Sequence, residues 1–451
     1  MATIKFYPSQ IGSSLVTPLS FTASPIKLLF QDLWCALINL KYAPGVFLAL
    51  TPTPSGDLDE LYPSLANLFN LALHAILFFL QFFFLLSIPV WILLPVWTVA
   101  IGFTMFWMFN FSLCWILNGS QLTYESDEQY AQKKPEHAHE QWLFLNGVCV
   151  GNGIIFDTLE CVIQRSLNYA STDIRTAYRT LKSTLYDENI TRVILILHSQ
   201  GAIEGSMIVD WLLAEIPQDL LQKLEIYTFG NAANHFNNPH LHLLSQKSAL
   251  THPNLQTTAT TTTVTTLNDK GPDAKKLHMH KSGNGKTIPH IEHYAHTYDF
   301  VSRWGVLYYT RNPPTEASAP RFMGRVFEKE VSGHMFVQHY LDGMFPLSKS
   351  VRKRLRGSGV TGNGEGLGNG WDWDSVDEGS QFMGAVVENG TKMGVRPGDK
   401  LGREGWNVSY CGGHGQEEEG TVGRRDKPGT DYMVGELSRL WLYRNGRSPK
   451  N

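Results

Sequence analysis

The strongest constraint on this chain is a long stretch without charge. No Lys, Arg, Asp or Glu occurs over Leu61–Tyr124. A helix that crosses a membrane needs about 20 consecutive apolar residues, so the stretch has room for two spans, expected near 65–88 and 96–117. Pro89 and Pro95 stand between them and would break one continuous helix. A buried hairpin in a soluble protein is the alternative, but core helices rarely lack charge over such a length.

The two spans predict a transmembrane helical hairpin over 65–118, with both of its ends on one side of the membrane. The start of the chain lacks the combination of a charged start followed by a compact apolar block that marks a cleavable signal peptide. Residues 1–64 contain short apolar stretches such as Leu28–Leu40 and are expected to lie close to the membrane surface. A membrane is therefore the first predicted partner.

The domain after the hairpin is expected to face the cytosol. Cysteines are odd in number and scattered, which does not suggest a disulfide framework. The sequons at Asn189, Asn389 and Asn407 would be used only on a lumenal side. The net charge of −3 shows no basic bias, so nucleic acid is not an expected partner. We therefore expect a two-span membrane protein with a cytosolic domain.

Residues 140–346 alternate between strand and helix patterns. The strand segments are continuous apolar runs, which are typical of strands covered on both faces. The helix segments have apolar residues at helical spacing. This alternation implies a mostly parallel α/β sheet with flanking helices and right-handed connections. The expected strands are 141–151, 191–197 and 223–234, and the expected helices are 171–185 and 201–216.

Three segments depart from this alternation. Residues 245–287 include a threonine-rich run and are expected to form a flexible insertion in the domain. Residues 351–427 are rich in Gly and charge and poor in apolar periodicity, which predicts a disordered tail. One short amphipathic helix is expected at 432–446, and the pattern leaves open whether it docks on the domain or on the membrane.

A serine stands where a buried strand turns into a helix, in the string LILHSQGAIEG at 195–205. A nucleophilic serine sits at such a turn, at the carboxyl end of a parallel strand. Gly201 fits the last position of G-x-S-x-G, but Leu197 occupies the first position and is expected to push the strand and helix slightly apart. Ser199 is therefore a candidate nucleophile. The alternative is a structural turn that happens to contain serine.

Residue order along the chain supplies partners for Ser199. On sheets of this kind the nucleophile is followed by an acid and then by a histidine. Asp299 comes just past an expected strand, and His334 follows the next strand in a Ser-Gly turn. Asp299 would orient the imidazole, and His334 would accept the Ser199 proton and later return it. His339, which lies inside the following helix, is the competing base.

Oxyanion donors are expected from the backbone. The N–H of Gln200 opens the helix after the serine, and the loop that begins at Gly147 would provide the second donor. Histidines are frequent between 235 and 296, but they do not show the convergent ligand set of a zinc site. We therefore expect neither a metal nor a cofactor.

Longer strings carry a resemblance to known families. IYTFGNAAN followed by HYAHTYDFVSRWG resembles class 3 lipases, in which a Thr-Phe-Gly strand precedes a loop with an acid. LILHSQGAIEG, YTFGNAANHFNNP, GHMFVQHYLDGMFP and SRLWLYRNG are similar to a group of uncharacterised fungal membrane proteins with an α/β-hydrolase-like domain. The similarity covers 65–345 with gaps, and 432–446. It implies an α/β-hydrolase fold, a serine hydrolase activity and a triad of Ser199, Asp299 and His334.

The favoured function is a membrane-anchored, lipase- or esterase-like hydrolase that cleaves a lipid or another acyl ester. Three observations favour a non-catalytic membrane scaffold instead. One is Leu197 in the serine motif, and another is the presence of long segments expected to be flexible. The third is the short 148–192 segment, which fits two helices but hardly the extra strand that this fold usually places there. An acyltransferase or a thioesterase would use the same triad.

Overall fold

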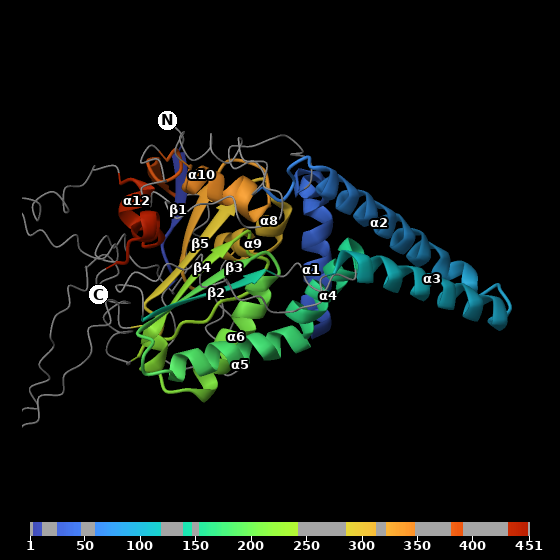
Figure 1. Cartoon of the computed structure of the whole chain (residues 1–451), viewed down its shortest axis with the longest axis horizontal. Helices are drawn as coiled ribbons and strands as arrows, with labels where there is room; N and C mark the ends of the chain where they lie inside the picture. Colours follow the sequence, from blue (N-terminus) through green and yellow to red (C-terminus); the bar gives the residue numbers. More distant parts are fainter. Residues whose placement is uncertain are drawn as a thin grey trace, which may run out of the picture.

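A mostly parallel sheet organises the computed structural model of the chain, as Figure 1 shows. The predicted α/β class is confirmed, since the described residues form a seven-stranded sheet in the order β2-β3-β4-β5-β6-β1-β7 with helices packed against it. The structure describes residues 3–10, 25–46, 59–118, 139–146, 153–241, 286–312, 322–347, 380–390 and 432–449.

Five neighbouring strands of the sheet run parallel, and the two at one edge bring in distant parts of the chain. The parallel strands are β2 (Glu140–Asn146), β3 (Arg192–His198), β4 (Leu224–Phe229), β5 (His290–His296) and β6 (Arg325–Lys329). β1 (Thr3–Tyr7) lies antiparallel to β6 and parallel to β7 (Val386–Asn389).

Helices of the connections cover one face of the sheet. From β2 to β6 each new strand is added on the same side of the previous one, so right-handed connections all cross the same face. Buried residues from these helices and from alternate strand positions, such as Leu195 and Leu197, form one apolar core there. The helices are α1 (Pro25–Asn39), α4 (Ile154–Leu167), α5 (Thr172–Tyr186), α6 (Gly201–Glu215), α8 (Phe300–Trp304) and α9 (Val306–Arg311), with the short turns η1 (Leu40–Val46) and η4 (Leu220–Lys223).

The opposite face of the sheet is covered by segments that follow the strands in the sequence. Its core joins strand residues such as Ile194 and Tyr294 to apolar residues near the C-terminus. The covering segments are a π-helical turn, η5 (Phe336–Leu341), α10 (Asp342–Met344), residues 380–385 before β7, α12 (Val434–Leu437) and the 3-10 turn η9 (Leu440–Gly446). A singly wound sheet leaves this face bare, so the C-terminal segments complete the core.

The domain therefore extends beyond the expected 140–346. Residues 3–7, expected to be membrane-proximal, form β1 in the sheet, with Ile4 and Phe6 fully buried. The expected disordered tail, 351–427, contributes β7, and its other residues lie outside the described part except for 380–385 and 390. Both strands are short, and each depends on a partner strand that is distant in the sequence. Of the expected insertion 245–287, only Lys286 and Thr287 are described, and both are buried.

The expected helix at 432–446 is two short helices, α12 and η9, docked on the sheet. Its break at Ser438 has a local cause. The buried carboxylate of Glu292 accepts the backbone N–H of Arg439 at 2.8 Å, which gives a new helix start its missing partner. The Arg439 guanidinium also pairs with Glu225 at 2.9 Å. Polar contacts at the amino ends of the strands thus hold this segment.

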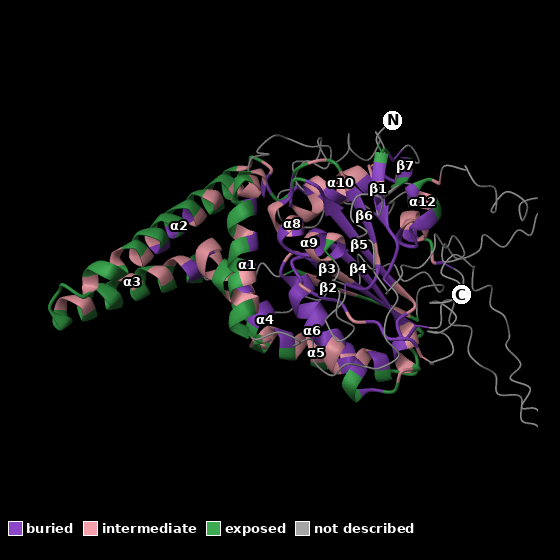
Figure 2. Cartoon of the chain, turned by 180° about the vertical axis from the view of Figure 1, so that it is seen from behind, coloured by how far each residue is buried: buried purple, intermediate pink, exposed green. Residues whose placement is uncertain are grey.

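Two long apolar helices, α2 (Leu65–Trp91) and α3 (Val96–Leu117), form a hairpin that projects from one side of the domain (Figures 1 and 2). Both are long and apolar enough to cross a membrane, as predicted. Of their residues, only Leu73, Leu77, Gln81 and Cys114 are buried, which is unlike a hairpin in the core of a soluble protein. Gln81 donates to Asn110 across the hairpin at 2.9 Å, a polar contact of the kind that joins membrane helices.

Candidate active site

Ser199 occupies a strained turn between β3 and α6. Its φ is +56°, in the left-handed region that side chains other than glycine rarely adopt. Its N–H donates to the carbonyl of Phe229 on β4 at 3.0 Å, and its own carbonyl accepts from Ala202 at 3.2 Å. The backbone is therefore held on both sides, which presents the serine side chain at the carboxyl end of the sheet.

Leu197 packs beside this turn because α6 has a glycine, Gly205, at the position that faces it. A Cβ added at Gly205 would lie 2.3 Å from the Leu197 Cδ1 atom, so the leucine side chain occupies the space that a side chain at 205 would need. The serine motif usually has a small residue at the strand position that Leu197 occupies. Here the small residue is Gly205 on the helix. The expected separation of strand and helix is therefore not required for this leucine to pack.

The structure brings Ser199, His334 and Asp299 into one hydrogen-bonded chain. The Ser199 Oγ lies 2.9 Å from His334 Nε2, and His334 Nδ1 lies 3.0 Å from Asp299 Oδ2. His334 is 5 % exposed and Asp299 is 1 % exposed, so little water competes for these bonds. With this geometry the hydroxyl proton of Ser199 can pass to Nε2 while the carboxylate stabilises the charged ring.

Asp299 is held ionised by a full set of donors. Ser302 Oγ donates to its Oδ2 at 2.7 Å, and the Tyr340 hydroxyl donates to the same oxygen at 3.0 Å. Its Oδ1 accepts the N–H of Val301 at 2.9 Å, which caps α8. Burial raises the pKa of Asp299, but His334 and these hydrogen bonds outweigh burial and lower the pKa to about 2.

Two neighbours that the sequence did not single out position the His334 ring. His198, directly before the serine, binds the His334 carbonyl through Nε2 at 2.8 Å and stacks on its ring with centroids 4.8 Å apart. Burial lowers the pKa of His198 to about 3, so its ring is neutral. Gly230 also lies against the His334 ring, since a Cβ at residue 230 would lie 2.8 Å from the ring atoms Cε1 and Nδ1. The sequence signal for His198 is its position directly before Ser199 in the string HSQG.

His339, the competing base, has a different place. Its Nδ1 accepts the backbone N–H of Met335 at 2.9 Å, and a Cβ at Gly333 would contact its ring at 2.5 Å. Burial lowers the pKa of His339. Within the described residues His334, not His339, lies against Ser199, and His339 fixes the turn that carries His334.

Of the two expected oxyanion donors, only Gln200 is described. It precedes α6, whose positive dipole end faces the serine, and its side chain donates to Gln164 on α4 at 3.0 Å. Gly147 lies outside the described residues, directly after β2. Among the described residues no group of three His, Cys, Asp or Glu side chains gathers to hold a metal.

The root of the hairpin lies next to this site. Glu60, just before α2, accepts the backbone N–H of Val337 at 2.8 Å and that of Gln338 at 3.2 Å. These residues open the π-helical turn that follows His334, and a carboxylate there satisfies N–H groups that a helix start leaves unpaired. The segment that carries the histidine is thus bound to the segment that starts the hairpin.

Comparison with models of protein families, with curated proteins and with solved structures found no match to the chain.

Proposed function

We propose that this protein is a serine hydrolase of the α/β-hydrolase type, anchored to a membrane by the α2–α3 hairpin and acting on an acyl ester. The observation that carries the proposal is the buried chain from Ser199 Oγ through His334 to Asp299. A serine in a left-handed turn, between a parallel strand and the helix that follows it, is the arrangement that such hydrolases use. The similarity of the longer strings to class 3 lipases and to fungal hydrolase-like membrane proteins points the same way.

In the proposed reaction the Ser199 Oγ attacks the ester carbonyl while His334 Nε2 takes its proton. The ester carbon–oxygen bond then breaks, His334 returns the proton to the leaving alcohol, and the acyl group stays on the serine. Water, activated by the same histidine, releases the acid. The backbone N–H of Gln200 would stabilise the oxyanion together with a donor from the loop after β2.

A lipid ester is the proposed substrate class because the site and the hairpin are adjacent. The Glu60 carboxylate connects the hairpin root to the turn after His334. In Figure 1 the carboxyl ends of β3 and β4 point toward the side on which α1 and α2 lie. A hydrolase held in this way meets acyl chains at the bilayer, where they are concentrated.

The test is labelling of the full chain in membranes by a fluorophosphonate probe, which reacts with activated serines. We expect labelling of the wild type and at least about 100-fold slower labelling of Ser199→Ala and His334→Ala, since a triad acts as a unit. Ser183→Ala changes an exposed serine on α5 and should label normally. His339→Asn should also retain most labelling, because the Asn side-chain oxygen can accept the Met335 N–H in place of His339 Nδ1.

Each outcome separates the alternatives. Equal labelling of Ser199→Ala and wild type would place the reactive serine elsewhere. A folded wild type without any labelling would favour the non-catalytic scaffold. If the probe reacts at Ser199 and a thiol or alcohol accepts the acyl group faster than water does, the protein is an acyltransferase rather than a hydrolase.

A further inference from the structure

Helix α1 carries large apolar side chains on its outer side, unlike a helix on a water-exposed surface. The side that packs on the domain buries Asp32, Cys35 and Asn39, with Leu29 and Ala36 packed on the core beside them. A surface helix of a soluble domain shows the opposite arrangement, with an apolar stripe inward and polar residues outward. We call the six large apolar residues on the other side the α1 outer face: Ile26, Phe30, Leu33, Trp34, Leu37 and Ile38, which are 44–66 % exposed.

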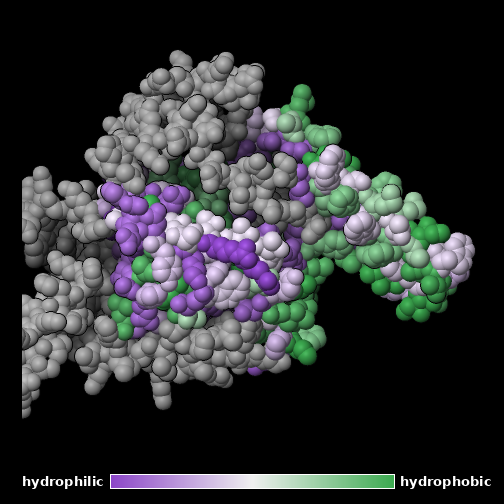
Figure 3. All heavy atoms as spheres, turned by 60° about the horizontal axis from the view of Figure 1, so that its bottom comes forward, coloured by the Kyte–Doolittle hydropathy of each residue, from purple (hydrophilic) through white to green (hydrophobic). Residues whose placement is uncertain are grey.

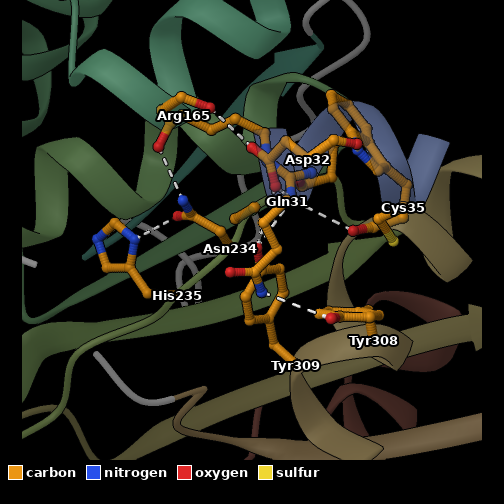
Figure 4. Close-up of polar contacts among 12 residues, drawn as sticks. Gln31, Asp32, Cys35, Arg165, Asn234, His235, Tyr308 and Tyr309 are labelled. Carbon is orange, nitrogen blue, oxygen red and sulfur yellow. Dashed lines mark hydrogen bonds and ion pairs between the residues drawn. The ribbon is translucent and has the colours of Figure 1, made fainter. Parts of the chain in front are cut away.

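Polar contacts prevent α1 from rotating this face inward. The Asp32 carboxylate pairs with Arg165 at 2.9 Å and accepts from Ser166 at 2.8 Å and from Tyr309 at 3.1 Å. Figure 4 shows Asp32 and its neighbour Gln31 directed toward Arg165 and the two tyrosines of α9. Turning α1 would leave Arg165, a fully buried cation, without its carboxylate. The outward direction of the apolar side chains is therefore built into the domain.

A second contact near the end of α1 acts in the same sense. Arg303 on α8 donates through Nε to the Asn39 side chain at 2.8 Å, and Asn39 donates to the Cys35 carbonyl at 2.8 Å. The helix is thus attached at its middle and at its last residue, on the same side. Both attachments keep the α1 outer face turned away from the sheet.

Charge on α1 is distributed as at a membrane interface. Within 25–46 the acidic residue is Asp32, which is buried, while Lys27 and Lys41 are exposed near the two ends of the helix. An apolar stripe with Phe and Trp, bordered by lysines, is the pattern of helices that lie in the plane of a bilayer with anionic headgroups.

The position of α1 connects this face to the hairpin. Both α1 and α2 pack against α4, and in Figures 1 and 2 α1 lies between the hairpin and the sheet and runs across the direction of the hairpin. A Cβ at Gly153, at the start of α4, would contact Leu77 in α2, so part of α2 lies alongside the domain. Figure 3 shows apolar surface over the projecting hairpin and on the adjoining side of the domain.

We propose that the α1 outer face is a membrane-contact surface, embedded at the headgroup–acyl boundary of the bilayer that the hairpin crosses. The proposal rests on the hairpin being a membrane anchor, as in the proposed function. Two spans alone would leave the molecule as a whole free to tilt in the bilayer. A third, in-plane contact fixes the tilt and holds the Ser199 end of the sheet at a constant distance from the lipid.

Photo-crosslinking tests this surface directly. p-Benzoylphenylalanine is placed at Phe30 or Trp34 in the full chain, which is reconstituted into vesicles of phosphatidylcholine and phosphatidylserine with a labelled phosphatidylcholine. On irradiation the benzophenone ketone inserts into a neighbouring C–H bond and becomes an alcohol. We expect lipid adducts at both positions, at least fivefold above those at Tyr186, an exposed aromatic residue on α5. Phe103 in α3 serves as the positive control.

The controls separate this proposal from the anchor itself. Adducts at Phe103 without adducts at Phe30 and Trp34 would overturn the α1 contact and leave the hairpin in the bilayer. No adduct at Phe103 would overturn the anchor and the proposal that rests on it. Crosslinks from Phe30 or Trp34 to another protein chain, seen as a dimer on a gel, would show that a second copy covers the face instead and would also overturn the proposal.

Discussion

At the scale of single residues, the site depends on close packing around the imidazole. His334 is bounded by the stacked ring of His198 on one side and by Gly230 on another. Gly230 has a φ of +55°, so it meets both a conformational and a steric requirement. Asp299 is surrounded by donors that need no water. In the proposed reaction the geometry of these residues would therefore be set before a substrate arrives, as electrostatic preorganisation requires.

Gly230→Ala should displace the His334 ring, because the added methyl would lie 2.8 Å from its Cε1 and Nδ1 atoms. We expect ester hydrolysis and fluorophosphonate labelling to fall about 10- to 100-fold, in keeping with a misplacement of about 1 Å. Gly45→Ala is the matched control, since its methyl would meet only ordinary contacts at 3.8 Å. Unchanged labelling rates in a folded Gly230→Ala variant would contradict the assigned contact.

Glu204, in the first turn of α6, makes stability depend on pH. Burial, together with Asp173 and Glu160, raises the pKa of its carboxyl to about 8. The native state then holds the proton more tightly than the unfolded state, so the associated stability is complete below about pH 4.5 and is lost as the pH rises through about 8. Glu204→Gln removes this loss, and its free energy of unfolding should exceed that of the wild type by a few kcal/mol at about pH 8.

Thermal unfolding in detergent at about pH 5 and pH 8 measures this effect. The gain in Tm of Glu204→Gln should be small at the lower pH and grow toward the higher one. Glu215→Gln is the control on the same helix, because Glu215 is largely exposed. A gain that is equal at both pH values would mean that the effect comes from packing and not from ionisation.

At the scale of elements, β3 and α6 share one interlocking contact. Leu197 and Gly205 exchange the sizes that the usual serine motif assigns to strand and helix. A similar dependence links the π-helical turn η5 to Glu60, whose carboxylate accepts the first backbone N–H groups of the turn. Around the site, a residue on one segment is therefore matched by a residue on another. The effect of substituting one residue of such a pair depends on the other.

Gly205→Ala should destabilise the domain by about 1–3 kcal/mol, since its methyl would overlap Leu197. Leu197→Ala alone leaves a cavity and should cost about 2–5 kcal/mol. The double variant Leu197→Ala with Gly205→Ala should cost less than the sum of the two, because the new methyl enters the vacated space. Chemical denaturation of all three variants gives this coupling free energy, and additive losses would show that the two side chains do not compete.

At the scale of the whole molecule, a singly wound sheet and the proposed membrane hairpin impose different demands. The sheet needs cover for the face that its connections leave bare, and residues 380–385 and 432–446 provide it. In the proposed arrangement the hairpin crosses a bilayer and has both of its ends on one side, so the entire sheet domain, including β1 before the hairpin and β7 after it, would lie on that side.

The side in question is proposed to be the cytosol, and Asn189 tests this. The residue is exposed, in the turn between α5 and β3, within a sequon. We expect no glycan there, so treatment with a glycan-removing amidase should leave the mass unchanged. A fusion that forces the isolated turn sequence into the lumen on a carrier shows whether the sequon is usable. A shift in mass for the native chain that Asn189→Gln abolishes would place the domain in the lumen.

Local patterns in the sequence determined the hairpin, the buried strands β3 and β4, the helices α5 and α6, and the three residues that meet at the candidate site. Hydrophobic spacing and turn residues determine structure over a few neighbouring residues, so they can be interpreted from the sequence. The order of serine, acid and histidine along the chain follows the order of the strands. Only the tertiary structure decided that His334 and not His339 lies against Ser199. It also decided that residues 3–7 and 386–389 pair in the sheet, and that α1 faces outward with its apolar side. Each of these depends on contacts between residues far apart in the chain, such as Asp32 with Arg165, which no local periodicity encodes.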